Sequence, residues 1–167
     1  QDNEGFMWFG TQDGLNRYDG KRLKVYKKDP LSSRSLGHNY ILSLFKNRSG
    51  NFWIGTYTGL IFFDREAETF KWFNEVYGDS SALDNVRVYA VNEDQDRNLW
   101  VGTFGKGLQL VDQRNKKIIQ FINDGQPGCI SANFIKDIHI DRRGNVWVAT
   151  FYNGLNLYDK ATGKFIQ

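Results

Sequence analysis

The sequence predicts an all-β fold made of four repeated four-stranded antiparallel sheets, and two observations lead to this prediction. Four of the five tryptophans recur at intervals of 45, 47 and 47 positions: Trp8, Trp53, Trp100 and Trp147. Each interval holds short runs rich in Val, Ile, Phe, Tyr, Trp and Thr, separated by Gly, Asp or Asn at spacings of roughly 8 to 12 residues. Such runs are typical of strands and turns, so a helical repeat of similar period is excluded.

Composition is consistent with one ordered region. The chain has 167 residues, of which 40% are hydrophobic and 25% charged, which argues against disorder and against a coiled coil. Its apolar runs, such as residues 60–63, are far shorter than the roughly 20 residues that span a bilayer, so we expect no membrane segment in these residues. The net charge is only +3 and the basic residues are dispersed, so no nucleic acid is expected as a partner. The densest basic group is predicted to be a solvated outer strand: Lys21, Arg22, Lys24, Lys27 and Lys28.

Every unit carries the same structural motif around its tryptophan. An Asp or Asn stands six positions before it, a threonine three positions after it, and a Gly-Leu pair follows the threonine. The threonines are Thr11, Thr56, Thr103 and Thr150. An aspartate closes each unit, at Asp19, Asp64, Asp112 and Asp159. We interpret these recurring residues as structural, because they occur in every unit.

The turns and strands can be placed from this motif. Asp and Asn side chains accept hydrogen bonds from the backbone of a following turn, and glycine tolerates left-handed backbone. Residues 47–51 (NRSGN) and 141–145 (DRRGN) are therefore predicted to be hairpins between the first and second strands of their units. In the second unit we expect strands at 40–45, 52–56, 60–64 and 70–73.

Four short strands in a period near 45 residues predict β-propeller blades. Blades pack on both faces, which explains strands such as LIFF (60–63) that do not alternate, and the tryptophans should be buried with their indole N–H groups satisfied locally. We expect a single propeller region with blades at about 1–39, 40–86, 87–134 and 135–167. The first unit begins at its second strand, giving about 15 strands. Because propellers close with about 4 to 8 blades, we expect an arc of a larger, seven-bladed propeller, completed by further blades or by another copy of the chain.

The four segments GFMWFGTQDGLNRYD, GNFWIGTYTGLIFFD, RNLWVGTFGKGLQLVD and GNVWVATFYNGLNLYD resemble the repeat of the two-component regulator propeller family. The resemblance covers essentially the whole chain, with small departures such as Ala149 in place of a glycine and Val111 in place of an aromatic residue. It implies a periplasmic sensor region of a hybrid histidine kinase, homodimeric in the parent protein and responsive to glycans. A histidine kinase or diguanylate cyclase output would lie outside these residues.

No catalytic constellation stands out from the repeat, so we expect neither an enzyme nor a cofactor in these residues. His38 and His139 lack the spacing of metal ligands, and Cys129 has no nearby partner. The run at Asp94 lacks the glycine and glutamate of a calcium loop. Two alternatives remain open. One is a propeller enzyme of the glycoside hydrolase or lyase type, which would need unique carboxylates or histidines near the axis; the other is a pure protein-interaction scaffold.

Ligand binding is predicted in the loops between the second and third strands, which vary while the frame is constant. Aromatic rings there can stack on sugar rings, and amides and charged groups can hydrogen-bond hydroxyls, so an oligosaccharide is the expected ligand. The candidate residues are Gln12, Asp13, Tyr57, Thr58, Phe104, Lys106, Tyr152 and Asn153.

Overall fold

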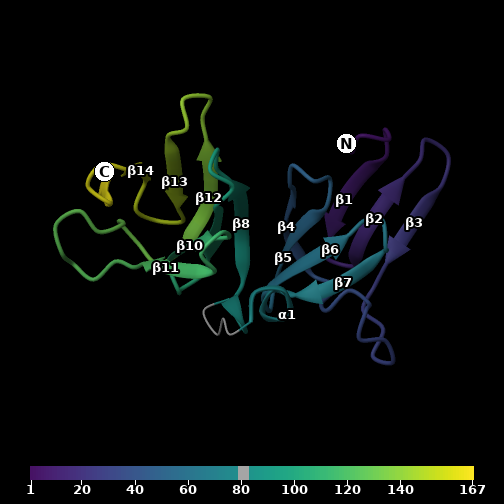
Figure 1. Ribbon diagram of the computed structural model, residues 1–167. Coiled ribbons are helices and arrows are strands. Elements are labelled where there is room, and N and C mark those ends of the chain that lie inside the picture. Colours follow the sequence, from purple (N-terminus) through teal and green to yellow (C-terminus); the bar gives the residue numbers. More distant parts are fainter. Residues whose placement is uncertain (79–82) are drawn as a thin grey trace. The chain divides into compact units, whose positions relative to one another are not determined.

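The computed structural model describes residues 1–78 and 83–167, which form two compact units, 1–87 and 88–167. Each unit contains two antiparallel sheets (Figure 1). In every sheet, strands that are consecutive in sequence are neighbours, which is the meander of a propeller blade. The prediction of an all-β fold built from blades is therefore confirmed.

The first unit holds sheets 1 and 2. Sheet 1 has three strands, β1 (Met7–Thr11), β2 (Gly14–Tyr18) and β3 (Leu23–Tyr26). Sheet 2 has four, β4 (Ile41–Lys46), β5 (Phe52–Thr56), β6 (Leu60–Asp64) and β7 (Thr69–Trp72), followed by the short helix α1 (Phe73–Tyr77).

The second unit holds sheets 3 and 4, each with four strands. Sheet 3 consists of β8 (Val88–Glu93), β9 (Leu99–Thr103), β10 (Leu108–Asp112) and β11 (Lys117–Phe121). Sheet 4 consists of β12 (Ile135–Ile140), β13 (Val146–Thr150), β14 (Leu155–Asp159) and β15 (Lys164–Ile166). Within residues 1–78 and 83–167 the four sheets have 15 strands, in agreement with the prediction of about 15.

The strands predicted at 52–56 and 60–64 are found as predicted, whereas the other two strands of sheet 2 differ by one residue. The strand β4 begins at Ile41 instead of residue 40. The strand β7 ends at Trp72 because Phe73 opens α1, where the Glu75 carboxylate accepts the Trp72 backbone N–H at 2.5 Å. The Phe73 ring stacks on Tyr77 one turn later, with centroids 4.7 Å apart.

The recurring Asp and Trp are joined by a hydrogen bond that we call the Asp–Trp lock. In three sheets one oxygen of the aspartate, Oδ1, accepts the backbone N–H groups two and four residues later, which closes the hairpin. The other oxygen, Oδ2, accepts the indole N–H six residues later. The bonded pairs are Asp2 and Trp8 at 2.8 Å, Asp94 and Trp100 at 3.0 Å, and Asp141 and Trp147 at 3.3 Å.

Sheet 2 lacks the lock because the residue at this position is Asn47. Its Oδ1 still accepts the backbone N–H groups of Ser49 and Asn51. Its second polar group is an NH₂, which donates and cannot accept an indole N–H. Accordingly, Trp53 Nε1 is buried without a hydrogen-bond partner among the residues described, so the prediction of a locally satisfied indole N–H is wrong for Trp53. The Trp53 ring packs on Phe62 at 5.0 Å.

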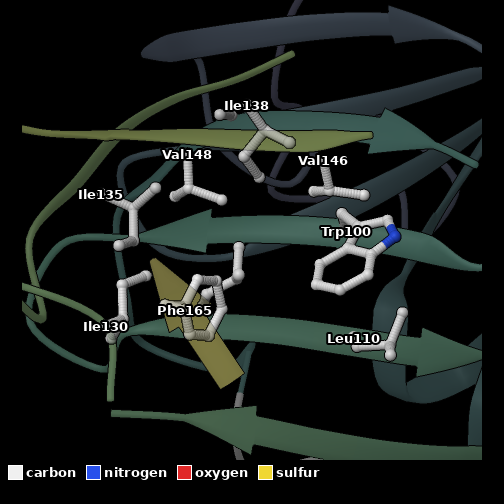
Figure 2. Packing of buried hydrophobic residues seen from close by; sticks show 10 residues of the cluster. Trp100, Leu110, Ile130, Ile135, Ile138, Val146, Val148 and Phe165 are labelled. Carbon is white, nitrogen blue, oxygen red and sulfur yellow. The ribbon is translucent and has the colours of Figure 1, made fainter. Parts of the chain in front are cut away.

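Within each unit, the tryptophan of one sheet packs against the next sheet. Trp8 contacts Phe52 and Phe63 of sheet 2, with centroids 5.0 and 5.5 Å apart. Trp100 contacts Tyr158 of sheet 4 at 5.0 Å and lies in a buried cluster with Leu110, Ile138, Val146 and Val148 (Figure 2). The prediction of four equivalent buried tryptophans is wrong for Trp147, which is half-buried because no sheet of its unit covers its face.

The glycine two residues after the tryptophan is required by this packing. A Cβ at Gly10 would lie 2.5 Å from Ile41 Cγ2, and a Cβ at Gly102 would lie 2.6 Å from Ile135 Cγ2. Each isoleucine begins the inner strand of the next sheet, so any larger residue would push the sheets apart. Sheet 4 has Ala149 at this position.

Polar contacts also hold sheets 1 and 2 together. Glu68 of sheet 2 accepts hydrogen bonds from the Tyr26 hydroxyl at 2.8 Å, from Arg17 at 3.4 Å and from Lys24 of sheet 1. The Lys24 and Arg17 contacts help to lower the pKa of Glu68, although partial burial opposes them. Burial together with the Glu68 contact raises the pKa of Tyr26.

The segment that precedes the first strand of a sheet runs along the fourth, outer strand of the same sheet; these segments are residues 27–40 for sheet 2 and 122–134 for sheet 4. The Arg34 carbonyl accepts the Phe70 N–H of β7 at 3.0 Å, and the Gly128 carbonyl accepts the Phe165 N–H of β15 at 2.8 Å. Since an uncovered outer strand can pair with other chains, these segments protect the two edges.

The Asp–Trp lock generates a pair of opposite predictions. Asp94→Asn replaces the oxygen that accepts the Trp100 N–H, so it should lower the free energy of unfolding by about 1–3 kcal/mol, the cost of an unsatisfied buried donor. Asn47→Asp supplies the missing acceptor to Trp53 and should raise this free energy by about 1 kcal/mol. Urea unfolding followed by tryptophan fluorescence measures both changes.

A matched control is Asp64→Asn, because Asp64 uses only Oδ1, for the N–H groups of Glu66 and Ala67. An asparagine keeps both bonds, so little change is expected. Equal destabilisation by Asp94→Asn and Asp64→Asn would show that the indole bond contributes nothing.

The aspartates also predict acid sensitivity. Hydrogen bonds from the Asn145 side chain and backbone lower the pKa of Asp141 to about 2. Hydrogen bonds likewise lower the pKa values of Asp2, Asp19, Asp112 and Asp159, at Asp2 against an opposing effect of burial. A carboxyl group whose pKa is lower in the folded state stabilises the fold above its unfolded pKa of about 3.9 and loses this effect as the pH falls.

We therefore expect the urea midpoint to be nearly constant from pH 7 to about pH 5 and to fall between about pH 4 and pH 2. Asp141→Asn should reduce the slope in this acidic range, because one of the titrating groups is gone. A midpoint that does not change down to pH 2 would contradict the role of these hydrogen bonds.

Candidate functional site

The recurring polar residues of the motif are engaged in turns. Each motif threonine donates its hydroxyl to the carbonyl of the following glycine, over 2.6 to 3.1 Å. Each closing aspartate accepts backbone N–H groups of the turn to the next strand; these residues are Asp19, Asp64, Asp112 and Asp159. The candidate site must therefore come from residues that do not repeat.

Two asparagines bring the variable loops together at one end of the sheets. The Asn39 side chain accepts the Lys28 N–H at 2.7 Å, while its backbone carbonyl accepts the Gly14 N–H at 2.9 Å. Asn133 in the second unit makes the same pair of bonds, to Asn123 and Gly107. The segment entering a sheet and the loop between the second and third strands of the preceding sheet thus form one loop surface in each unit.

A pocket of about 360 Å³ opens on this surface in the first unit. Its lining comes from the two segments on either side of sheet 2, from the end of β7, from α1 and from the β5–β6 loop: Lys28, Gly37, His38, Thr58, Trp72, Asn74, Asp84 and Asn85. This volume lies within the range of about 300–1,000 Å³ that is usual for small-molecule sites. We refer to it as the Trp72 pocket.

The Trp72 indole is fixed by two glycines. A Cβ at Gly37 would lie 2.3 Å from Trp72 Cζ2, and one at Gly59 would lie 3.2 Å from Cζ3. Gly59 also has φ +150°, a conformation that side chains rarely adopt. The indole therefore lies directly against backbone, and only glycine fits at both positions.

Polar groups surround the indole. Asn74 Nδ2 lies 3.5 Å from the Asp84 carboxylate, and the Asn85 backbone N–H donates to the Thr58 carbonyl at 3.0 Å. Asn85 has left-handed backbone, at φ +52°. The pocket thus presents an ammonium, a carboxylate, two amides and a hydroxyl around one aromatic ring, a combination suited to a small ligand rich in hydroxyl groups.

Tyr57 stands beside this pocket and is held by its neighbours. Its ring lies 6.2 Å from His38 and 5.5 Å from Tyr40, and the Arg87 guanidinium stacks on it at 4.1 Å and donates to its hydroxyl. His38 Nδ1 accepts the Tyr40 N–H at 3.0 Å, so His38 orders the loop.

The other two predicted residues of this unit do not line the pocket. Asp13 forms an ion pair with Lys27 at 2.5 Å, and Gln12 is exposed.

In the second unit the loop surface carries an aromatic cluster. Phe104 packs on Phe134 at 4.7 Å and on Phe151 at 5.3 Å, and Tyr152 contacts Phe151 at 5.9 Å. Tyr152 is 74% exposed, so the cluster is open to solvent.

Lys106 and Asn153 lie in the same two loops as this cluster. The Lys106 carbonyl accepts amide hydrogens from Gln109 and Gln120, and the Asn153 N–H donates to Thr150. Of the four residues predicted in this unit, Phe104 and Tyr152 are thus brought into one aromatic cluster through Phe151, whereas Lys106 and Asn153 lie in the loops beside it.

Sequence reasoning missed Tyr89 and Lys136, which complete this cluster. Tyr89 contacts Phe151 at 4.9 Å, and the Lys136 ammonium lies 5.1 Å from the Phe151 ring. Tyr89 is the second residue of β8 and Lys136 is the second residue of β12. At this position the pairing of the first strand of a sheet with the second shifts register by a β-bulge, in β4 as well as in β8 and β12. A bulge turns a side chain toward a new direction, and no local sequence signal marks it here.

Neither a metal cluster nor a spanning helix is found in residues 1–78 and 83–167. No group of three or more His, Cys, Asp or Glu side chains there could hold a metal ion. No helix in the same residues is long and apolar enough to cross a membrane.

Comparison with known proteins agrees with the repeat and the fold. Residues 35–58, 82–105 and 129–152 match the two component regulator propeller family. A stretch of 36 residues is 47% identical to histidine kinase P4 of Formosa agariphila, covering 22% of this chain and 3% of that protein.

Solved structures show the same blade fold. The extracellular domain of a protein described as a hybrid two component system, BT4673 of B. thetaiotaomicron, matches 100% of this chain and 24% of its own, at 23% identity and a TM-score of 0.81. A virginiamycin B lyase from Staphylococcus aureus matches 98% of this chain and 52% of its own, at 10% identity and a TM-score of 0.66. The chain thus spans about a quarter of the first of these structures.

Each matched segment begins just before the first strand of a sheet and ends in the loop between the second and third strands of that sheet. The matched segments therefore include these loops of the candidate surface. These three segments are therefore similar to two component regulator propeller repeats.

Proposed function

We propose that this chain is part of the extracytoplasmic, periplasmic sensor of a two-component signalling protein and that it binds an oligosaccharide without converting it. The observation that carries the proposal is the Trp72 pocket, where a fixed indole is surrounded by amide, hydroxyl, carboxylate and ammonium groups. The family of the repeats and the extracellular two-component domain of the same fold support the sensor role. The kinase or cyclase output belongs to the parent protein.

A glycan is the favoured ligand because of the chemistry of the pocket. A sugar ring has an apolar face that stacks on an aromatic ring and a rim of hydroxyls that both donate and accept hydrogen bonds. Trp72 offers the ring, and Asn74, Asn85 and Asp84 offer donors and acceptors at its edge. In the second unit, exposed Tyr152 beside Phe151 offers a separate aromatic stacking surface.

The absence of turnover is proposed because the repeated carboxylates already accept several hydrogen bonds each. Asp19, Asp112 and Asp159 have lowered pKa values from such bonds, which makes them poor general acids. The propeller lyases show that the fold supports catalysis in other proteins, so turnover has to be tested directly.

Calorimetry of the chain against a panel of neutral and acidic oligosaccharides tests the proposal. Lys28→Ala and Asn74→Ala remove exposed groups from the rim of the Trp72 pocket and should each weaken binding by about tenfold, close to the value of one good polar contact. Lys117→Ala removes another exposed lysine, from the outer strand β11, and should leave the affinity unchanged.

The variants Tyr57→Ala and Tyr152→Ala compare the two units. Weaker binding in both variants supports a role in binding for the loop surface of each unit, whereas an effect of Tyr57→Ala alone restricts the ligand to the Trp72 pocket. Unchanged affinity in Lys28→Ala, Asn74→Ala and Tyr57→Ala would place the site elsewhere. Chromatography of the titrated sugar that shows a new product would favour the enzyme alternative, and no binding to any member of the panel would favour the interaction scaffold.

A further inference from the structure

Two chain segments meet the Trp72 indole at different atoms of its six-membered ring. A Cβ at Gly37, in the segment before sheet 2, would lie 2.3 Å from Cζ2. A Cβ at Gly59 would lie 3.2 Å from Cζ3 and 3.0 Å from the carbonyl oxygen of Leu83, in the segment before sheet 3. The two segments therefore border the indole at different edges. All residues that line the Trp72 pocket belong to the first unit.

The segment before sheet 2 brings a lysine to the pocket. The Lys28 backbone N–H donates to the side chain of Asn39, the residue after His38, at 2.7 Å, and both Lys28 and His38 line the pocket. The preceding Lys27 forms an ion pair with Asp13. Lys28 is exposed and makes no ion pair within residues 1–78 and 83–167. Its ammonium group is therefore available to a ligand.

His38 adds a second hydrogen-bond donor beside Lys28. Its Nδ1 accepts the Tyr40 backbone N–H at 3.0 Å, so the proton of the neutral imidazole is on Nε2. Within the part of the chain that the structure describes, this Nε2–H group has no hydrogen-bond partner. The pocket thus has an ammonium and an imidazole N–H on neighbouring parts of one segment.

The other polar groups of the pocket already contact each other. Asn74 Nδ2 lies 3.5 Å from the Asp84 carboxylate, and the Asn85 backbone N–H donates to the Thr58 carbonyl at 3.0 Å. The carboxylate is thus near a donor of the protein itself. The lining groups that lack a protein partner among the described residues are the two donors of the segment before sheet 2.

We propose that the sugar bound in the Trp72 pocket is a uronic acid, whose carboxylate accepts hydrogen bonds from Lys28 and His38. This inference rests on the proposed function and specifies its substrate class. One carboxylate oxygen can accept from the ammonium and the other from the imidazole N–H, and such charge-assisted bonds are the strong ones. The sugar ring then stacks on Trp72, and its hydroxyls donate to Asp84, a carboxylate that would repel a second anion.

Calorimetry with matched ligands tests this assignment. Oligogalacturonate carries the carboxylates, its methyl ester has nearly the same shape without the charge, and an oligosaccharide of galactose lacks the group altogether. The acid should bind at least about tenfold more tightly than the ester and the neutral sugar. Equal affinities for the three would overturn the acidic assignment and leave the proposed function standing. No binding of any of them, or of any other oligosaccharide in the panel, would overturn both.

Two variants locate the contact with the carboxylate. Lys28→Gln removes the charge at similar length, so the preference for the acid over the ester should fall by about tenfold. His38→Asn keeps an acceptor for the Tyr40 N–H near the place of Nδ1 but removes the Nε2–H donor, so the affinity for the acid should fall at least about threefold. Thermal melting by circular dichroism checks both folds, and Lys28→Gln alone decides if His38→Asn melts early.

Lys21→Gln is the matched control, because it makes the same charge change at an exposed residue between β2 and β3 that does not line the pocket. Its preference for the acid should equal that of the wild type. An equal loss of preference in Lys21→Gln and Lys28→Gln would overturn the proposal, since net charge would then explain it, as would an unchanged preference in Lys28→Gln. Tighter binding of a sulfated galactose oligosaccharide or of oligoglucosamine than of oligogalacturonate would also overturn it.

Discussion

The hydrogen bond between an aspartate and the indole six residues later links the local and the tertiary structure of this chain. One carboxylate closes the hairpin with Oδ1 and orients the tryptophan with Oδ2, as at Asp94 and Trp100. The indole then packs against the next sheet, where Trp100 makes an edge-to-face contact with Tyr158. Because the same group shapes the turn and positions the wedge, the repeat needs few other fixed residues.

The loops at the end of the sheets opposite the Asp–Trp locks can vary in sequence, because the locks and not these loops hold the repeat together. Once Trp8 and Trp100 hold neighbouring sheets together, the entering segments and the loops between second and third strands need only a few backbone bonds, such as those of Asn39 and Asn133. This freedom permits a polar pocket around Trp72 in one unit and an aromatic cluster around Phe104 in the other. The same frame can therefore present different chemistry to different ligands.

The frame was predictable from the sequence because its signals recur. Two strands of sheet 2 lie where predicted, since Asx and glycine turns fix their ends, and the unpaired Trp53 N–H can be traced to Asn47 at a position where the other units have aspartate. Features that occur in only one of the repeats were not predictable. Phe73 fits a strand pattern as well as a helix start, and the exposure of Trp147 depends on what packs on its face.

The candidate site was predictable only in part for the same reason. The loops of Tyr57, Phe104 and Tyr152 could be found as the variable parts of the repeat. The pocket beside Tyr57 depends on Trp72, Asn74 and Asp84, which come from non-repeating segments, and Tyr89 reaches its cluster through a bulge. The role of such residues in a site depends on tertiary contacts, and no local pattern in a single sequence reveals those contacts.

A double-mutant cycle between Asp94 and Trp100 tests the central role of the Asp–Trp lock most directly. Unfolding free energies of the wild type, Asp94→Asn, Trp100→Phe and the double variant isolate the energy of their interaction. We predict a coupling of about 1–3 kcal/mol, because Asp94→Asn should cost much less once the indole N–H is gone. Strictly additive effects would contradict the account, since the hairpin and the tryptophan would then be stabilised independently.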